Sequence, residues 1–205
     1  MTHFITLEGP EGCGKTTQAL LLCEELRARG HDVLHTREPG GTEIGEQIRR
    51  VLMDLQNTAM LPQVEVLLFS ASRAQLVRDV IKPHLTGGGV VICDRFYDST
   101  LAYQGYGHGL NLEALRAITA FATEGLSPDL TLLLDVPVED GLQRKQTEGE
   151  WNRLDAYDIP FHSKVRTGYL QMANDEPDRW QVIDATRSIE AVQADIRAAV
   201  LALLD

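Results

Sequence analysis

Cysteine, long apolar runs and an excess of positive charge are all scarce in this sequence. Cys13, Cys23 and Cys93 are its only cysteines, and they have neither the spacing of a metal site nor the even number of a disulfide framework. We therefore expect reduced thiols and a cytoplasmic protein. No window is apolar enough to span a bilayer, and no basic segment leads into a long apolar run, which predicts no signal peptide and no membrane segment.

Basic residues are outnumbered, with 19 Lys and Arg against 30 Asp and Glu, for a formal net charge of -11. Such a surface repels polyanions, so we expect no nucleic acid and no anionic membrane as partner. A small phosphorylated ligand is still compatible, because a local basic site can overcome an acidic background. With 205 residues, 43% of them hydrophobic, the chain is predicted to be one globular domain, 1–205.

Short apolar runs alternate with helical patterns along the chain. The runs expected to be strands are Phe4–Leu7, Val33–His35, Val90–Cys93, Leu130–Leu134 and Gln181–Ile183. Apolar residues at helical spacing recur between them, around 19–26, 64–71, 112–122 and 189–203. This alternation predicts an α/β fold, a three-layer, doubly wound, five-stranded parallel sheet.

A long helix is expected to begin at Pro62 and to stop before Pro83. Val64, Leu67, Leu68 and Ala71 share one side of it, which we interpret as its core stripe. Phe69 and Arg73 lie on the opposite side, four residues apart. Either a second helix or subunit packs on Phe69, or a base stacks there while Arg73 donates to a base carbonyl, as suits the O4 of thymine or uracil.

The segment 143–158 is polar, carries Gly149 and does not fit the alternation. It is either a solvated connector or a small lid over a ligand.

One motif carries most of the chemistry. Gly9-Pro10-Glu11-Gly12-Cys13-Gly14-Lys15-Thr16 matches G-x-x-x-x-G-K-[ST] between the first strand and the first helix. Its glycines let backbone N–H groups approach phosphate, Lys15 would reach the β- and γ-phosphates of ATP, and Thr16 would hold Mg²⁺. The D-x-x-G and [NT]-K-x-D motifs of a GTPase are missing, which disfavours a guanine-nucleotide switch.

Charged residues follow three of the expected strands, where ligands bind in open α/β sheets. Glu8 ends the first strand, the segment 36–42 follows the second, and Asp94-Arg95 follows the Val90–Cys93 run. They are either solvated surface charges or a second anion site. In the second interpretation Asp94 orders a Mg²⁺-bound water and Arg95 clamps an acceptor phosphate.

As a set, these residues resemble the thymidylate kinase family. The motifs are G-P-E-G-C-G-K-T-T, T-R-E-P-G-G-T, F-S-A-S-R, D-R-F-Y-D-S-T-L-A-Y-Q-G and I-D-A-T, in the family's order and over essentially the whole chain. The resemblance implies a homodimer and transfer of the ATP γ-phosphoryl group to dTMP.

The resemblance also assigns roles to matching positions. It implies a dTMP site of Arg37, Glu38, Pro39, Phe69, Arg73, Arg95, Ser99, Thr100, Tyr103 and Gln104. It implies an ATP site of the segment 9–16 together with Thr17, Ala185 and Thr186. Glu8 and Asp94 are expected to help Thr16 organise Mg²⁺.

The family's catalytic arginine is expected in the lid, because Gly12 stands where some members carry an arginine in the phosphate loop. The lid is poorer in arginine than related lids, and Asn152 replaces a usual Asp. We predict Arg153, then Arg144, to act beside Lys15, Arg95, Glu8 and Asp94. Pro160 is expected to interrupt the helix before Phe161. The alternatives are a kinase for another monophosphate or for a deoxynucleoside, and an inactive ATP-binding regulator.

Overall fold

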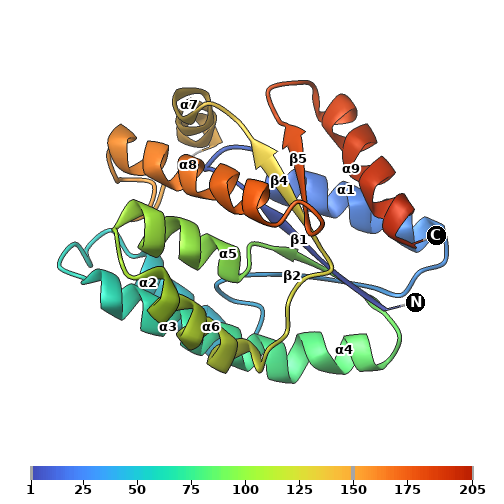
Figure 1. Cartoon of the computed structure of the whole chain (residues 1–205), viewed down its shortest axis with the longest axis horizontal. Coiled ribbons are helices and arrows are strands. Elements are labelled where there is room, and N and C mark those ends of the chain that lie inside the picture. Colours follow the sequence, from blue (N-terminus) through green and yellow to red (C-terminus); the bar gives the residue numbers. More distant parts are fainter. Residues whose placement is uncertain (1, 149–150, 205) are drawn as a thin grey trace.

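The computed structural model describes residues 2–148 and 151–204, in which a five-stranded parallel sheet has helices on both faces (Figure 1). The strands are β1 (His3–Glu8), β2 (Val33–Arg37), β3 (Val90–Asp94), β4 (Leu130–Asp135) and β5 (Trp180–Asp184), in the order β2-β3-β1-β4-β5. All five expected strands are found, and the predicted α/β class is confirmed.

The helices were only partly predicted. They are α1 (Lys15–Ala28), α2 (Glu43–Met53), α3 (Pro62–Leu76), α4 (Lys82–Thr86), α5 (Tyr97–Thr100), α6 (Leu112–Thr123), α7 (Val138–Glu148), α8 (Ile159–Asp175) and α9 (Ile189–Leu204), with π-helical segments η1 (Val77–Ile81) and η2 (Leu101–Gly107). The sequence analysis did not predict α2 or α5. Ile44, Ile48, Val51 and Leu52 do recur at helical spacing in α2, and this pattern was missed, whereas α5 is only four residues long.

Two separate apolar layers cover the sheet. On one face α1 and α9 pack over Ile5, Leu7 and Ile92. On the other, α8 and η2 cover Leu133, and the α3–η1 run covers Phe4 and Val91. Alternate residues of the central strands therefore point into different layers, as expected for strands buried on both sides.

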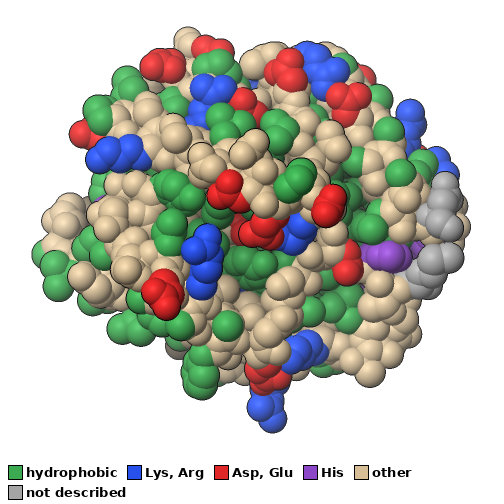
Figure 2. Space-filling model, viewed as in Figure 1, with side chains coloured by type: hydrophobic (Ala, Val, Ile, Leu, Met, Phe, Trp, Pro, Cys, Tyr) green, Lys and Arg blue, Asp and Glu red, His purple; other side chains and the backbone are tan. Residues whose placement is uncertain are grey.

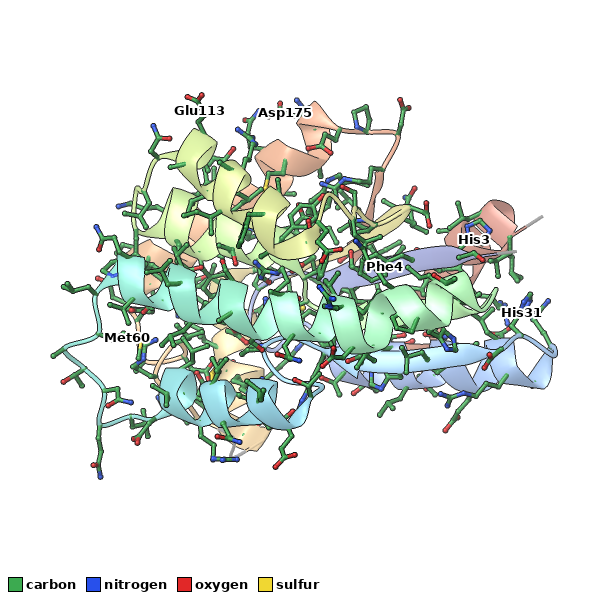
Figure 3. The ribbon with its side chains drawn as sticks, turned by 90° about the horizontal axis from the view of Figure 1, so that it is seen from below. His3, Phe4, His31, Met60, Glu113 and Asp175 are labelled. Carbon is green, nitrogen blue, oxygen red and sulfur yellow. The ribbon has the colours of Figure 1, made fainter. Side chains whose placement is uncertain are left out.

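The expected stop before Pro83 is wrong. The wider π-helical turn η1, in which the Lys82 N–H donates to the Val77 carbonyl, carries the chain on from α3 into α4, and Pro83 lies in the first turn of α4. Figure 3 shows this continuous run crossing the molecule, with Met60 near one end and His3 and His31 at the other. Pro160 likewise begins α8, which Asp158 caps by accepting from the N–H of Phe161 at 2.9 Å, so the predicted interruption there is wrong.

The predicted core stripe of α3 is also wrong. Val64 is 42% exposed and Leu67 60% exposed, whereas Val66, Phe69 and Arg73 are buried. Apolar residues lie on two sides of α3, so the periodicity of the sequence fits either side as the buried one. The prediction took the exposed side as the core.

Surface charge is mixed on the face shown in Figure 2, where Lys and Arg side chains lie among Asp and Glu side chains. Within the described ranges, no helix is both long and apolar enough to cross a membrane.

Candidate active site

A cavity of about 670 Å³ opens at the carboxyl ends of β1, β2 and β3. It joins the phosphate loop to the wall formed by α3, α5 and η2. The predicted site residues that line it are Glu11, Gly12, Gly14, Lys15, Thr16, Thr17, Arg37, Glu38, Pro39, Phe69, Asp94, Arg95, Ser99, Thr100, Tyr103 and Gln104. The two sites expected from the sequence are therefore parts of one space.

The phosphate loop has the backbone that its glycines predict. Gly9, Gly12 and Gly14 have φ values of 145°, 66° and 90°, which side chains rarely allow. Lys15 Nζ donates to the carbonyl oxygens of Gly9 and Pro10 at 3.3 and 2.9 Å and lies 3.3 Å from Cys13 Sγ. The ammonium group thus lies over the loop, within reach of a phosphate held there.

Gly12 is required by packing as well as by its dihedral angle. A Cβ built at Gly12 would overlap the carbonyl oxygen of Gly141, because α7 lies directly against the loop. Any larger side chain at position 12 would push α7 away. The structure thus explains why this loop carries no arginine of its own.

Two of the three predicted metal ligands lie together. Thr16 Oγ1 donates to Asp94 Oδ2 at 2.5 Å, and both line the cavity. Among the described residues no group of three His, Cys, Asp or Glu side chains is placed to hold a metal ion. The pair suits Mg²⁺ bound mainly through phosphate and water, which is the usual way that this ion binds beside a nucleotide.

The third predicted metal ligand, Glu8, does not lie with the other two in the cavity lining. Its side chain is fully buried and does not line the cavity. It accepts hydrogen bonds from the N–H of Phe96 at 2.7 Å, Ser99 Oγ at 2.6 Å and Tyr169 Oη at 2.9 Å. Since these donors enclose both oxygens, Glu8 organises the end of β1, and its geometry does not support the predicted role as a metal ligand. Burial, and then the nearby Asp98 carboxylate, raise the pKa of Glu8 to about 7.

Arg95 connects the phosphate loop to the acceptor side. It has a φ of 66°, in the left-handed region, directly after β3. Its guanidinium donates to Glu11 Oε1 at 2.9 Å, to the Gly9 carbonyl at 3.1 Å and to Ser99 Oγ at 3.1 Å. Tyr103 Oη also donates to Glu11, at 2.7 Å. Although burial opposes it, Arg95, then Lys15 and Tyr103, lower the pKa of Glu11 to about 2.

The acceptor side has an aromatic wall with a charged layer behind it. Phe69 lines the cavity, whereas Arg73 is 1% exposed and lies behind the wall. Arg73 Nε donates to Glu38 Oε2 at 2.8 Å and Nη2 to Thr100 Oγ1 at 3.0 Å, whereas Nη1 is buried with no partner among the described residues. An unpartnered buried donor is costly, so Nη1 is suited to a ligand acceptor.

Arg37 and Arg49 flank the mouth of the cavity. The Arg37 side chain is 52% exposed, and its hydrogen bonds to Glu46 are long, at 3.4 Å. Arg37 can therefore turn toward an anion. Arg49 donates to the Pro39 carbonyl at 3.0 Å. The sequence analysis missed Arg49. The signal that could have found it is its position one turn after Gly45, in a helix that Thr42 caps.

The predicted lid arginines lie outside the cavity lining. Arg153 is 6% exposed; Nη1 donates to Glu65 Oε1 at 2.5 Å and Nε to the Leu52 carbonyl at 2.9 Å. Arg144 Nη1 donates to the Ala185 carbonyl at 3.0 Å. Lys145, which the sequence reasoning missed, does line the cavity. Residues 149 and 150 of the expected lid lie outside the described residues.

The loop expected near adenine lies beyond α7. Thr186 Oγ1 donates to Asp184 Oδ1 at 2.6 Å, directly after β5. Neither Ala185 nor Thr186 lines the cavity, and Arg144 connects them to α7.

A phosphate loop and an aromatic-walled second pocket in one cavity, over a sheet of this order, define a P-loop nucleoside monophosphate kinase. Comparison with known proteins gives the family. The sequence profile described as "Thymidylate kinase" matches residues 7–196. The chain belongs to the thymidylate kinase family.

Individual relatives agree over nearly the full length. The chain is 54% identical to the thymidylate kinase of Roseiflexus castenholzii, over 98% of this chain and 93% of that protein. It is also 54% identical to that of Deinococcus radiodurans, over 96% of this chain and 95% of the relative. The crystal structure of thymidylate kinase from Ehrlichia chaffeensis is similar with a TM-score of 0.80 and 34% identity, over 97% of this chain and 98% of that one.

The raised pKa of Glu8 predicts a pH-dependent cost to stability. A carboxyl whose folded pKa of about 7 exceeds its ordinary 4.5 favours folding most at low pH, and this contribution is lost as pH rises through 7. Glu8→Gln should therefore gain about 2 kcal/mol in unfolding free energy, relative to the parent, between pH 5 and pH 8. Urea unfolding of both proteins at the two pH values measures this. An equal difference at both would show that Glu8 is ionised throughout.

Proposed function

We propose that this chain transfers the γ-phosphoryl group of ATP to dTMP, giving dTDP and ADP. Membership of the thymidylate kinase family supports the reaction, and the observation that supports it in this chain is the single cavity shared by the phosphate loop and the Phe69 wall. The same observation disfavours an inactive regulator, since both halves of a transfer site are present.

The chemistry needs positioning more than acid–base catalysis. The second pKa of a phosphate monoester is about 6, so the dTMP phosphate is mostly a dianion and attacks without a general base. Its oxygen forms a bond to the γ-phosphorus as the bond from that phosphorus to the β–γ bridging oxygen breaks, and the electron pair leaves with ADP.

The remaining barrier is the approach of two anions. Lys15 would bind the donor phosphates, and Arg95 and Arg37 would bind the acceptor phosphate. Thr16 and Asp94 would hold Mg²⁺, which when bound neutralises charge on the β- and γ-phosphates. Segment 143–158 would act as a lid that excludes water, within the single domain 1–205.

Base recognition would use the wall and the layer behind it. Phe69 would stack on thymine while Arg73 Nη1, the unpartnered donor, reads O4. Cytosine presents a donor at that place, so Arg73 would disfavour it. Ser99, Thr100, Tyr103 and Gln104 would complete the pocket, with Glu38 and Pro39 shaping the phosphate side. Ala185 and Thr186 would contact adenine.

A coupled ADP-release assay with one acceptor at a time tests the reaction. Turnover with dTMP should exceed that with dCMP, AMP or GMP by at least about tenfold, since each wrong base leaves buried polar groups unpaired. It should also exceed turnover with thymidine, because thymidine has no phosphate for Arg37 and Arg95 to bind. Chelation of Mg²⁺ should abolish turnover, and added Mg²⁺ should restore it. Faster turnover with AMP or GMP would keep the phosphotransferase activity and overturn the base pocket, whereas faster turnover with thymidine would overturn the acceptor-phosphate site.

The lid would supply a further cation to the transition state. We assign this role to Arg153 because its Nη2 is buried without a partner among the described residues, so it can donate hydrogen bonds to an anion. Reaching the phosphates would require Nη1 to leave Glu65 as the lid closes. Arg144 is the second choice, and Lys145 already faces the cavity.

Single Ala substitutions separate these three residues. Arg153→Ala should lower kcat on the order of a thousandfold, as expected for a transition-state arginine, with little change in the KM for dTMP. Arg144→Ala and Lys145→Ala are the matched controls and should keep kcat within a few-fold. If Lys145→Ala alone loses kcat, the assignment to Arg153 is wrong.

We also propose that the chain forms a homodimer in the cytoplasm. The exposed apolar side of α3, with Leu61 62%, Val64 42% and Leu67 60% exposed, supports a second subunit there, since such contiguous apolar surface usually marks an interface. The free, buried thiols of the three cysteines support a reducing compartment.

A charge in this surface should break the dimer. Leu67→Glu should move the protein from dimer to monomer in analytical ultracentrifugation at micromolar concentration, because an interface buries the carboxylate unpaired. The matched control is Ile189→Glu, since Ile189 is 53% exposed on α9 at the other face of the sheet. A parent that sediments as a monomer, or a Leu67→Glu variant that stays dimeric, would contradict this interface.

A further inference from the structure

A buried carboxylate, Glu65, lies directly behind the base pocket and has no role in the reaction described so far. It is 0% exposed, one helical turn before Phe69 in α3, and does not line the cavity. Gln104, from η2, is 1% exposed and does line it. Gln104 Nε2 donates to Glu65 Oε2 at 2.9 Å. Glu65 thus contacts a pocket residue on the side away from any ligand.

The other oxygen of Glu65 is also occupied. Oε1 accepts from Arg153 Nη1 at 2.5 Å and from Tyr157 Oη at 2.9 Å, and His108 Nε2 lies 3.5 Å from Oε2. Burial alone would raise the pKa of Glu65, but the nearby His108 and the hydrogen bonds from Arg153 and Gln104 lower it to about 2. The side chain is therefore an ionised carboxylate at neutral pH.

An ionised carboxylate can only accept hydrogen bonds, whereas an amide has a donating and an accepting end. Gln104 must therefore turn its NH₂ group to Glu65 and its oxygen away from it. No described residue donates to Gln104 Oε1. The carbonyl end of the amide is left for the cavity that Gln104 lines.

We propose that Glu65 is a specificity-determining positioning residue, which holds the Gln104 amide so that its oxygen accepts from the N3–H of thymine and opposes the N3 lone pair of cytosine. This inference rests on the proposed dTMP kinase function. At N3 thymine is a donor and cytosine an acceptor, so a fixed amide orientation discriminates between them. A freely turning amide would satisfy both bases and discriminate little. Gln104, held by Glu65, and Arg73 would then read neighbouring positions of the same base edge independently.

A purely structural role for Glu65 makes a different prediction. As an anchor for Arg153 and Tyr157 alone, Glu65 would affect lid closure, and its loss would lower turnover with every acceptor by the same factor. The ratio of kcat/KM for dTMP to that for dCMP isolates the role in specificity, because effects common to both acceptors cancel.

Glu65→Gln provides the test, since an amide at 65 can also donate and so allows Gln104 to turn. The dTMP:dCMP ratio should fall at least about tenfold, with the KM for ATP unchanged. The matched control is Tyr157→Phe, which removes a hydrogen bond to Oε1 and leaves Oε2 with Gln104; its ratio should stay within twofold of the parent. Where dCMP turnover is too slow, calorimetric Kd values for dTMP and dCMP give the ratio.

A second background tests whether Glu65 acts through Gln104. In Gln104→Met, which has no amide to orient, adding Glu65→Gln should leave the ratio unchanged. If Glu65→Gln fails to fold, Glu65→Asp keeps the charge for Arg153 but shortens the reach to Gln104, and should change the ratio in the same direction. A folded Glu65→Gln with the parent's ratio, or an equal loss with both acceptors, would overturn the proposal. A parent inactive with dTMP would instead overturn the proposed function.

Discussion

The guanidinium of Arg95 is the contact on which the site depends. It donates to Gly9 and Glu11 in the phosphate loop, to Ser99 after β3 and to Tyr169 in α8, so that three other parts of the chain share one largely buried cation. A buried charge is tolerated only when it is paired and hydrogen-bonded. The loop, the end of β3 and α8 must therefore keep their relative positions for Arg95 to be satisfied.

The need to pair buried charges also applies to the residues behind the base pocket. Arg73 is paired with Glu38, and Glu65 with Arg153, and all four side chains are buried. Each pair leaves a group beside it for the cavity: Nη1 of Arg73 and, through Glu65, the oxygen of Gln104. Polar groups fixed by buried partners cannot readjust to a wrong base, which links packing to specificity.

α3 has apolar residues on two of its sides. Val66 and Phe69 are buried, and Val64 and Leu67 on another side are exposed. A helix apolar on two sides gives a periodic signal that fits either as the core. The choice is made by the neighbours, since α3 must turn Phe69 and Arg73 toward α5 and η2 to build the pocket.

The sequence by itself determined the local features: the strands, and the glycine loop with Lys15 and Thr16. These depend on neighbours within a few residues, where spacing and residue type suffice. Only the tertiary structure decided that Glu8 is enclosed by donors away from Thr16, that Arg153 pairs with Glu65, and that Glu65 orients Gln104. Such buried pairings join residues far apart in sequence, and no local pattern records which charge meets which.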